Sequence, residues 1–121
     1  MLDKFKVIIA GGRHFKDYST LCKVCDHMLK NKSIIEIVSG KAKGADTLGE
    51  QYAKERGYKI KEFPANWELG KAAGYIRNKD MAYYADALIA FWDKNSKGTK
   101  HMIDLAKEKN LKIKIVYYDN N

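Results

Sequence analysis

The chain has 121 residues, of which 45% are hydrophobic and 31% are charged, a balance typical of soluble globular proteins and not of disordered ones. Its length suits one compact domain with a core of its own, so we expect residues 1–121 to form a single domain. No apolar run approaches the roughly 20 residues that a transmembrane helix needs. The first residues lead almost directly into a strand without a signal peptide, so we expect a cytoplasmic protein with no membrane partner.

The chain is strongly basic, with 23 lysines and arginines against 15 acidic residues and a formal net charge of +8. A positive field of this kind attracts nucleic acids and phosphate-bearing ligands. The alternative is that scattered surface lysines only keep the protein soluble. We favour the alternative for the run KEKNLKIK and a ligand role for Lys41 and Lys43, which lie in a glycine-rich turn.

Five strands and four helices are predicted to alternate along the chain, which is the pattern of a parallel sheet covered by helices. The strands are expected at about 6–10, 34–38, 58–63, 87–92 and 112–117. The first helix follows Asp17 as its N-cap, and the second spans 45–56 and stops at Gly57. The third covers about 71–84, and the fourth opens at Gly98 and ends near Asn110.

The hydrophobic pattern of the strands predicts their order in the sheet. The runs VIIA, IIEIV and ALIAFW are almost continuously apolar, as strands buried on both faces are. The runs YKIKEF and KIKIVYY alternate with lysine, which is typical of edge strands. We therefore predict an α/β, Rossmann-like, three-layer fold with a mainly parallel five-stranded sheet of order 3-2-1-4-5 and helices on both faces.

Cys22 and Cys25 form a C-x-x-C pair, which in other proteins can be a redox or metal site. Here the pair falls inside the first helix and completes an apolar face together with Leu21, Met28 and Leu29. Two thiols also cannot fill a tetrahedral zinc site. We expect the cysteines to be structural, and we expect no metal and no cofactor.

Glycine-bearing, basic loops follow three of the strands: GGRHF after the first, SGKAKGAD after the second and DKNSKGT after the fourth. In a sheet of this order, ligands bind beyond the carboxyl ends of the strands, so the three loops are expected to meet around one anionic ligand. Neither G-x-G-x-x-G nor a complete P-loop motif is present, which disfavours an ordinary dehydrogenase or NTPase. The alternative is that the glycines serve turn geometry alone.

Further candidate residues lie on the third helix and near the mouth of the expected site. Arg77 could offer its planar fork to a phosphate, with Asn78 beside it, and the alternative is a surface arginine in a salt bridge. Four aromatic residues near the mouth are candidates to stack a base, although packing is the alternative for each of them: Phe15, Trp67, Tyr75 and Trp92.

The segments VIIAGGRHF, VSGKAKGAD, GYIRNKDMA and ALIAFWDKNSKGT, taken together, resemble the YspA-related branch of the SLOG superfamily. These are Rossmann-like domains that include the LOG phosphoribohydrolases. The resemblance spans about residues 6–116 and implies binding of a nucleotide or nucleotide-derived ligand. Together with Lys43, Arg77 and Asn78, it yields these expected ligand-binding residues: Gly11, Gly12, Arg13, Ser39, Gly40, Gly44, Ala45, Asp46, Ser96, Gly98 and Thr99.

The sequence leaves open whether this protein is an enzyme. The LOG phosphoribohydrolases resemble it at Gly98-Thr99 but carry a glutamate where this chain has Met102, so the carboxylate that would assist N-glycosidic cleavage is missing. Asp46 or Asp93 could supply a carboxylate in its place, and the catalytic candidates that we retain are Asp46 and Arg77. Asp46 could instead accept ribose hydroxyls, or simply favour the positive start of a helix.

Three functions therefore stay open at this point. The first is binding of a nucleotide-like small molecule, by a sensor, a sequestering module or a slow hydrolase. The second is binding of single-stranded nucleic acid in the same basic crevice. The third is an active nucleoside-monophosphate phosphoribohydrolase. Homo-oligomerisation is compatible with all three.

Overall fold

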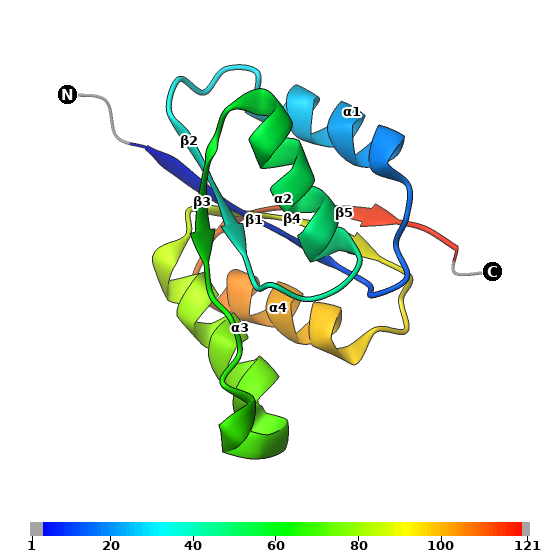
Figure 1. The fold of residues 1–121 in the computed structure, drawn as a ribbon, viewed down its shortest axis with the longest axis vertical. Helices are drawn as coiled ribbons and strands as arrows, with labels where there is room; N and C mark the ends of the chain where they lie inside the picture. Colours follow the sequence, from blue (N-terminus) through cyan, green and yellow to red (C-terminus); the bar gives the residue numbers. More distant parts are fainter. Residues whose placement is uncertain (1–3, 120–121) are drawn as a thin grey trace.

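The computed structural model describes residues 4–119, which form one parallel β-sheet with helices on both faces (Figure 1). The elements in chain order are β1 (Phe5–Gly11), α1 (Tyr18–Leu29), β2 (Ile35–Ser39), α2 (Ala45–Arg56), β3 (Lys59–Glu62), the 3-10 helix η1 (Trp67–Ala72), α3 (Ala73–Tyr84), β4 (Ala87–Trp92), α4 (Lys97–Glu108) and β5 (Lys112–Tyr117). The strand order is β3-β2-β1-β4-β5 and every neighbouring pair is parallel. The predicted Rossmann-like fold is confirmed.

The strands are buried as their hydrophobic patterns predict. All five residues of β2 are buried, and β4 is buried up to Phe91. In the edge strands β3 and β5, by contrast, the lysines are exposed and the intervening isoleucines are partly buried. Because only a central strand is covered on both faces, lysine alternation identifies the edges correctly.

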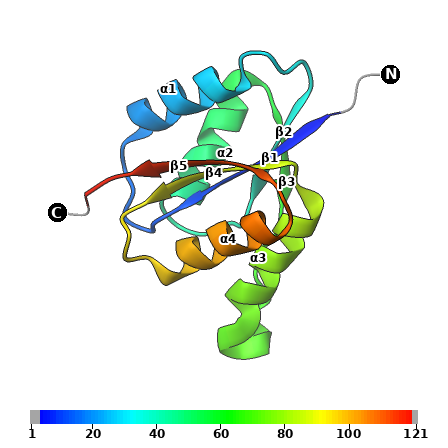
Figure 2. The same cartoon turned by 180° about the vertical axis from the view of Figure 1, so that it is seen from behind.

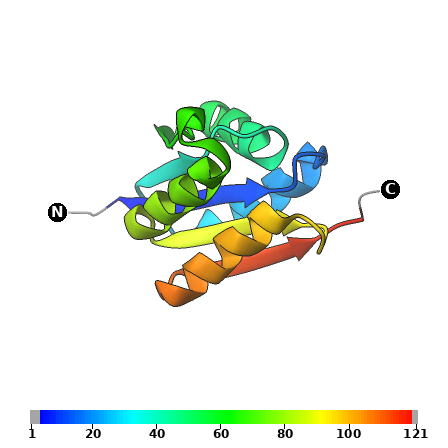
Figure 3. The same cartoon turned by 90° about the horizontal axis from the view of Figure 1, so that it is seen from below.

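The helices divide evenly between the two faces of the sheet. Figure 2 shows α1 and α2 on one side of the sheet and α3 and α4 on the other, and Figure 3 shows the sheet from below with its strand arrows pointing the same way. Each face has its own hydrophobic cluster. Ile9, Ile37 and Phe91 lie in the α1–α2 cluster, whereas Ile8, Leu88 and Met102 lie in the α3–α4 cluster.

The helix ends follow the predicted signals, with one difference. The Asp17 side chain accepts a hydrogen bond from the Thr20 amide at 3.1 Å, and Gly57 takes the left-handed conformation that ends α2. The third helix, however, begins at Ala73 and not at about residue 71. The preceding turn is the 3-10 helix η1, which Gly70 interrupts with its φ of 76°.

Helix α1 buries fewer residues than predicted. Leu21, Cys25 and Leu29 are buried, but Cys22 is only partly buried. The prediction for Met28 is wrong: its side chain is 41% exposed because it lines an open groove beside β5. Both cysteines are free thiols, and burial raises the pKa of Cys25 to about 12.

Among residues 4–119, none of the helices combines the length and the hydrophobicity that crossing a bilayer requires. The same residues contain no cluster of three or more histidine, cysteine, aspartate or glutamate side chains arranged to hold a metal ion.

Candidate functional site

A small cavity of about 110 Å³ opens at the carboxyl ends of the central strands, where the sequence predicts the ligand. β1, the β2–α2 loop, α3 and the start of α4 contribute its walls. Its lining residues are Ala10, Gly11, Ala42, Asp46, Arg77, Asn78, Met81, Ser96, Gly98, Thr99 and Met102. Seven of these were predicted to bind ligand: Gly11, Asp46, Arg77, Asn78, Ser96, Gly98 and Thr99.

Arg77 is the cation in the wall of this cavity. Its Nε donates a hydrogen bond to Oδ1 of Asn78 at 3.0 Å, and its Nη1 donates to the backbone carbonyl of Gly40. These two bonds fix the plane of the guanidinium. Within residues 4–119, neither a hydrogen bond nor an ion pair engages Nη2, so this nitrogen keeps its donors for a ligand.

Asn78 connects Arg77 to the start of α4. Its side chain is 6% exposed, and Nδ2 lies 3.3 Å from the carbonyl oxygen of Gly98 and 3.2 Å from Nδ1 of His101. Partial burial lowers the pKa of His101, which favours the neutral ring that accepts from Asn78 at Nδ1. The sequence analysis did not identify His101. The signal available in the sequence was its position two residues after Thr99, close to the expected start of the fourth helix.

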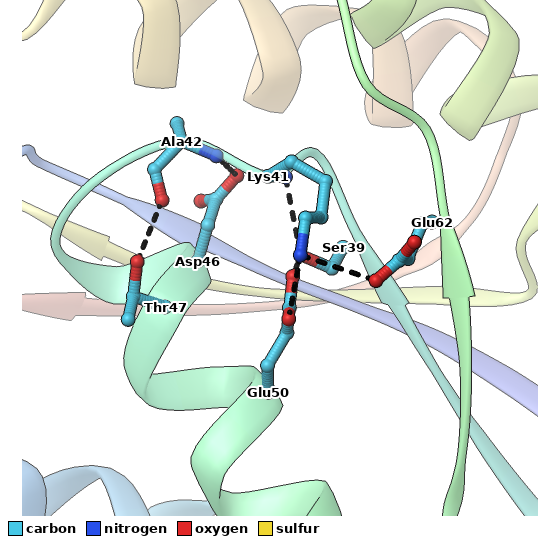
Figure 4. A network of polar contacts seen from close by, with 7 residues as sticks. All are labelled: Ser39, Lys41, Ala42, Asp46, Thr47, Glu50 and Glu62. Atoms are coloured by element: carbon cyan, nitrogen blue, oxygen red, sulfur yellow. Dashed lines mark hydrogen bonds and ion pairs between the residues drawn. The ribbon is translucent and has the colours of Figure 1, made fainter.

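Asp46 sits in the first turn of α2 with 5% of its surface exposed. Its Oδ2 accepts a hydrogen bond from the Ala42 amide at 3.3 Å (Figure 4). Burial raises the pKa of Asp46 to about 7, although the Ala42 amide, the Arg77 charge and the Gly40 backbone oppose the shift. The glycine-rich turn is therefore already occupied by the carboxyl group of the chain's own Asp46.

Lys41 does not face the cavity, contrary to the ligand role that we favoured for it. Its Nζ lies 3.0 Å from Glu50 on α2 and 3.1 Å from Glu62 on β3 (Figure 4). Ser39, predicted to bind ligand, is occupied in the same network, since its Oγ donates to Glu50 at 2.6 Å and accepts from the Lys41 amide. This cluster joins β2, α2 and β3.

The glycines of the first two loops approach the chain's own atoms. A Cβ on Gly11 would lie 2.3 Å from the Phe91 carbonyl oxygen, and one on Gly12 would lie 1.9 Å from the hydroxyl of Tyr118. Gly44, at a φ of 80°, packs against the backbone of Gly12 and Arg13. Close packing within the protein is sufficient to account for glycine at these three positions. Ala45 is likewise fully buried, and its amide donates to the Gly12 carbonyl.

The start of α4 is only partly open. The Oγ of Ser96 accepts a hydrogen bond from the Thr99 amide at 3.3 Å and lies 2.9 Å from Oγ1 of Thr99. The Thr99 amide is therefore not free to contact a ligand, because Ser96 acts as an N-cap. Gly98 is exposed and has open space above its Cα, so the cavity is accessible there.

The remaining predicted residues lie outside the lining of the cavity. The Arg13 and Lys43 side chains are exposed to solvent, and Gly40 contributes its carbonyl to Arg77. Four further residues line the cavity although we did not predict them as ligand-binding residues: Ala10, Ala42, Met81 and Met102. Small or apolar side chains carry no chemical signal in the sequence, which explains why Ala42 and Met81 were missed.

The four aromatic candidates differ in exposure. Phe15 is buried and stacks on Phe91 at 4.6 Å between ring centroids, so it belongs to the core. The indole N–H of Trp92 donates to the Ser96 carbonyl at 3.0 Å. Tyr75 meets the His101 ring edge-on at 4.4 Å. Trp67, in contrast, is 69% exposed.

A larger groove of about 710 Å³ lies at the opposite, amino-terminal edge of the sheet. Its charged residues are Lys4, Lys6, Lys32, Lys112 and Asp86, and it is widely open to solvent. Lys32 and Lys112 lie over the Phe5 ring, at 4.4 and 5.8 Å from its centroid. Size alone does not make this groove the better candidate, because it lacks the buried, oriented polar groups of the carboxyl-edge cavity.

The parallel sheet of order 3-2-1-4-5 defines a Rossmann-like fold, and the cavity lies at its carboxyl edge. The profile of the YspA, cpYpsA-related SLOG family matches residues 5–70. The chain belongs to this family. The match covers the first two loops but neither Arg77 nor the start of α4, and no curated protein matches the chain in a sequence search.

Two solved structures share the fold. DNA processing protein A from Streptococcus pneumoniae superposes with a TM-score of 0.76 at 21% identity, covering 96% of this chain and 51% of that one. DNA processing protein A from Helicobacter pylori, whose structure was described for its single-stranded DNA binding mode, gives 0.71 at 19% identity, covering 97% and 67%. The chain thus spans about half the length of the first of these proteins, and at such identities the likeness establishes the fold alone.

Proposed function

We propose that this protein, acting as a single domain over residues 1–121, binds a nucleotide or a nucleotide-derived ligand at the carboxyl ends of β1, β2 and β4. The phosphate of the ligand contacts Nη2 of Arg77 and the open surface at Gly98. The observation that carries the proposal is the fixed guanidinium in the cavity wall, held by Gly40 and Asn78 with one nitrogen to spare. Arginine is the side chain best suited to such recognition.

In this proposal the phosphate lies at Arg77 and Gly98 and not at the turn SGKAKGAD, which the sequence analysis includes among the ligand-binding loops. The buried Asp46 carboxylate occupies the start of α2, and Lys41 is bound to two glutamates. A phosphate placed there would meet a carboxylate in a poorly solvated position, which is unfavourable. The start of α4 carries no acidic residue in its first turn, so it favours an anion.

We favour a protein that binds its ligand and cleaves it slowly or not at all. Cleavage of an N-glycosidic bond needs a positioned acid or base, and the expected glutamate position is the apolar Met102, which is 1% exposed. Asp46 is the carboxylate among the lining residues, and it is engaged by the backbone of its own loop.

Titration calorimetry with AMP, GMP, CMP and UMP tests the proposal. We expect saturable binding with one ligand per chain for at least one nucleotide. Absence of binding for all four, and for ribose 5-phosphate, would overturn it. An N-glycosidase assay on the same nucleotides then separates a binding protein from a phosphoribohydrolase.

A second candidate function is binding of single-stranded nucleic acid. The observations that favour it are the shared fold with a DNA processing protein described as binding single-stranded DNA, and the net charge of +8. A strand that contacts Z lysines or arginines would give a log–log salt slope of about −0.7Z. Steep salt dependence and affinity that grows with oligonucleotide length would support this candidate.

The site used by such a strand can be identified with a charge-matched pair of variants. Lys32, Lys112 and Lys114 line the groove on the β5 side, whereas Lys54, Lys79 and Lys107 are exposed on helices elsewhere. If the groove beside β5 binds the strand, replacing its three lysines, Lys32, Lys112 and Lys114, with glutamine should weaken binding strongly. Replacing the three control lysines, Lys54, Lys79 and Lys107, should weaken binding far less. If the carboxyl-edge cavity binds it, Arg77→Ala should have the larger effect.

A further inference from the structure

Trp67 presents an indole ring to solvent at the mouth of the candidate site. It is the first residue of η1 and is 69% exposed, the most exposed of the large hydrophobic side chains among residues 4–119. The Asn66 side chain caps this turn by accepting from the Glu68 amide at 3.2 Å. In Figure 1 the segment that follows β3 extends away from the sheet before α3 begins. An exposed indole presents a flat aromatic face on which a base can stack.

Trp67 and Arg77 both lie next to Gly74. A Cβ built on Gly74 would stand 3.6 Å from Nη2 of Arg77 and 4.0 Å from Cη2 of Trp67. The nitrogen that Arg77 leaves free for a ligand therefore faces the same surface as the indole. Because residue 74 is a glycine, no side chain of its own separates the two groups.

The cavity cannot enclose a complete nucleotide. Its volume is about 110 Å³, whereas sites that bury drug-sized ligands measure roughly 300 to 1,000 Å³. A phosphate and part of a ribose would fill it. The remainder of the ligand must then lie outside the cavity. The surface over Gly74 toward Trp67 adjoins Nη2 of Arg77 and is available for it.

We propose that Trp67 forms a nucleobase subsite, on which the base of the ligand stacks while its phosphate contacts Arg77. This inference rests on the proposed function and narrows it: the ligand keeps its base and is not a simple sugar phosphate. Of the other aromatic candidates, Phe15 stacks on Phe91 in the core and the Trp92 indole donates to the Ser96 carbonyl. Tyr75 meets the His101 ring edge-on and is 50% exposed, less than Trp67 at 69%. Stacking on an indole is tolerant of base identity, so the subsite selects for a base and only weakly among bases.

The test compares AMP with ribose 5-phosphate, which lacks the base, on wild type, Trp67→Ala and Trp67→Phe. Trp67→Ala should weaken AMP binding about 5- to 150-fold, the range of base–aromatic stacking, and should change ribose 5-phosphate binding less than about twofold. Trp67→Phe should keep most of the AMP affinity, because a phenyl ring also stacks. Tyr83→Ala, which removes an exposed aromatic outside the cavity lining, is the matched control and should behave as wild type.

Fluorescence supplies a second readout. AMP should quench the wild-type emission through Trp67, and ribose 5-phosphate should not. The quenching should disappear in Trp67→Phe, in which Trp92 is the remaining tryptophan. Equal loss of affinity for both ligands in Trp67→Ala, or unchanged affinity for AMP, would overturn the base subsite and leave the phosphate site standing. If wild type binds neither ligand, the proposed function fails, and the subsite fails with it.

Discussion

Arg77 on α3 donates a hydrogen bond from Nη1 to the backbone carbonyl of Gly40, just beyond the end of β2. The two residues are 37 positions apart in the chain, and their contact brings the third helix against the turn that follows β2. Because of this contact, the Arg77 side chain loses its rotamer freedom when the protein folds. The free energy of ligand binding therefore does not include that loss of side-chain entropy. The contact is the feature that makes the carboxyl-edge cavity the better candidate site.

Asp46 predicts a pH dependence of stability. Its pKa of about 7 in the folded protein lies above the ordinary value of 3.8, so the folded state binds more protons between these values. Its contribution to stability is therefore complete below about pH 4 and is lost as the pH rises through 7. Each pKa unit corresponds to about 1.4 kcal/mol. Asp46→Asn, which does not titrate, should gain stability relative to wild type on going from pH 5 to pH 8, as measured by urea unfolding at both values. A constant difference between the two proteins would contradict this assignment.

The same carboxyl group should affect phosphate binding. Once Asp46 is ionised it repels a phosphate in the cavity that it lines, so AMP should bind more weakly at pH 8.5 than at pH 7. A phosphate monoester loses its second proton near pH 6, so AMP is mainly a dianion at both values. Asp46→Asn should show almost no change across this range. Parallel pH profiles for variant and wild type would exclude Asp46 as the cause.

The two cysteines should differ in their contributions to stability. Cys25 is completely buried in the α1–α2 cluster, whereas Cys22 is partly exposed. We expect Cys25→Ala to lower the free energy of unfolding by about 1 to 2 kcal/mol and Cys22→Ala by less than about 0.5 kcal/mol. Both variants should bind AMP like wild type. Zinc bound in stoichiometric amount, or a larger cost at Cys22, would show that the pair has a chemical role.

Hydrophobic patterning was sufficient to predict the fold, and it could not reveal most of the contacts in the site. Continuous apolar runs and lysine alternation distinguish central from edge strands because burial itself selects those residues. In contrast, Lys41 binds Glu62 and Gly12 packs under Tyr118, and these partners lie 21 and 106 residues away along the chain. No local pattern indicates such pairs, so the sequence could not show which residues of the basic and glycine-rich loops are engaged within the protein.

Arg77 and Asn78 were identified from residue type, and their role in binding stays a prediction. Their chemistry, a planar fork beside an amide on a helix near the expected edge, was visible in the sequence. What the sequence could not show is which Arg77 nitrogens are already engaged, since this depends on the Gly40 carbonyl and the Asn78 amide. The capping of Thr99 by Ser96 was readable as an N-cap signal, and the resemblance drew attention to a ligand role for both residues instead.

Met102 predicts slow or undetectable glycosidic cleavage. Loss of a positioned acid or base typically reduces the rate 10²- to 10⁴-fold and leaves binding largely intact. Wild type should therefore release almost no free base from the nucleotides that it binds. Met102→Glu places a carboxylate in the cavity lining, and chromatographic assay of free adenine from AMP should show increased release if the variant folds. Circular dichroism checks folding, because an unpaired carboxylate at this 1% exposed position is destabilising. Rapid release by wild type would show that Asp46 or another group supplies the catalytic function.

The affinity of AMP for Arg77→Ala and for Arg13→Ala, measured side by side with wild type, tests the location of the site most directly. The two variants lose the same charge, but Arg77 lines the cavity and Arg13 is exposed outside its lining. Hydrogen bonds to charged groups contribute about 1.5 to 3 kcal/mol, so Arg77→Ala should weaken binding about tenfold or more. Arg13→Ala should weaken it less than about threefold. Equal losses would show that net charge alone attracts the ligand, and a larger loss for Arg13→Ala would place the ligand at the first loop and contradict the account.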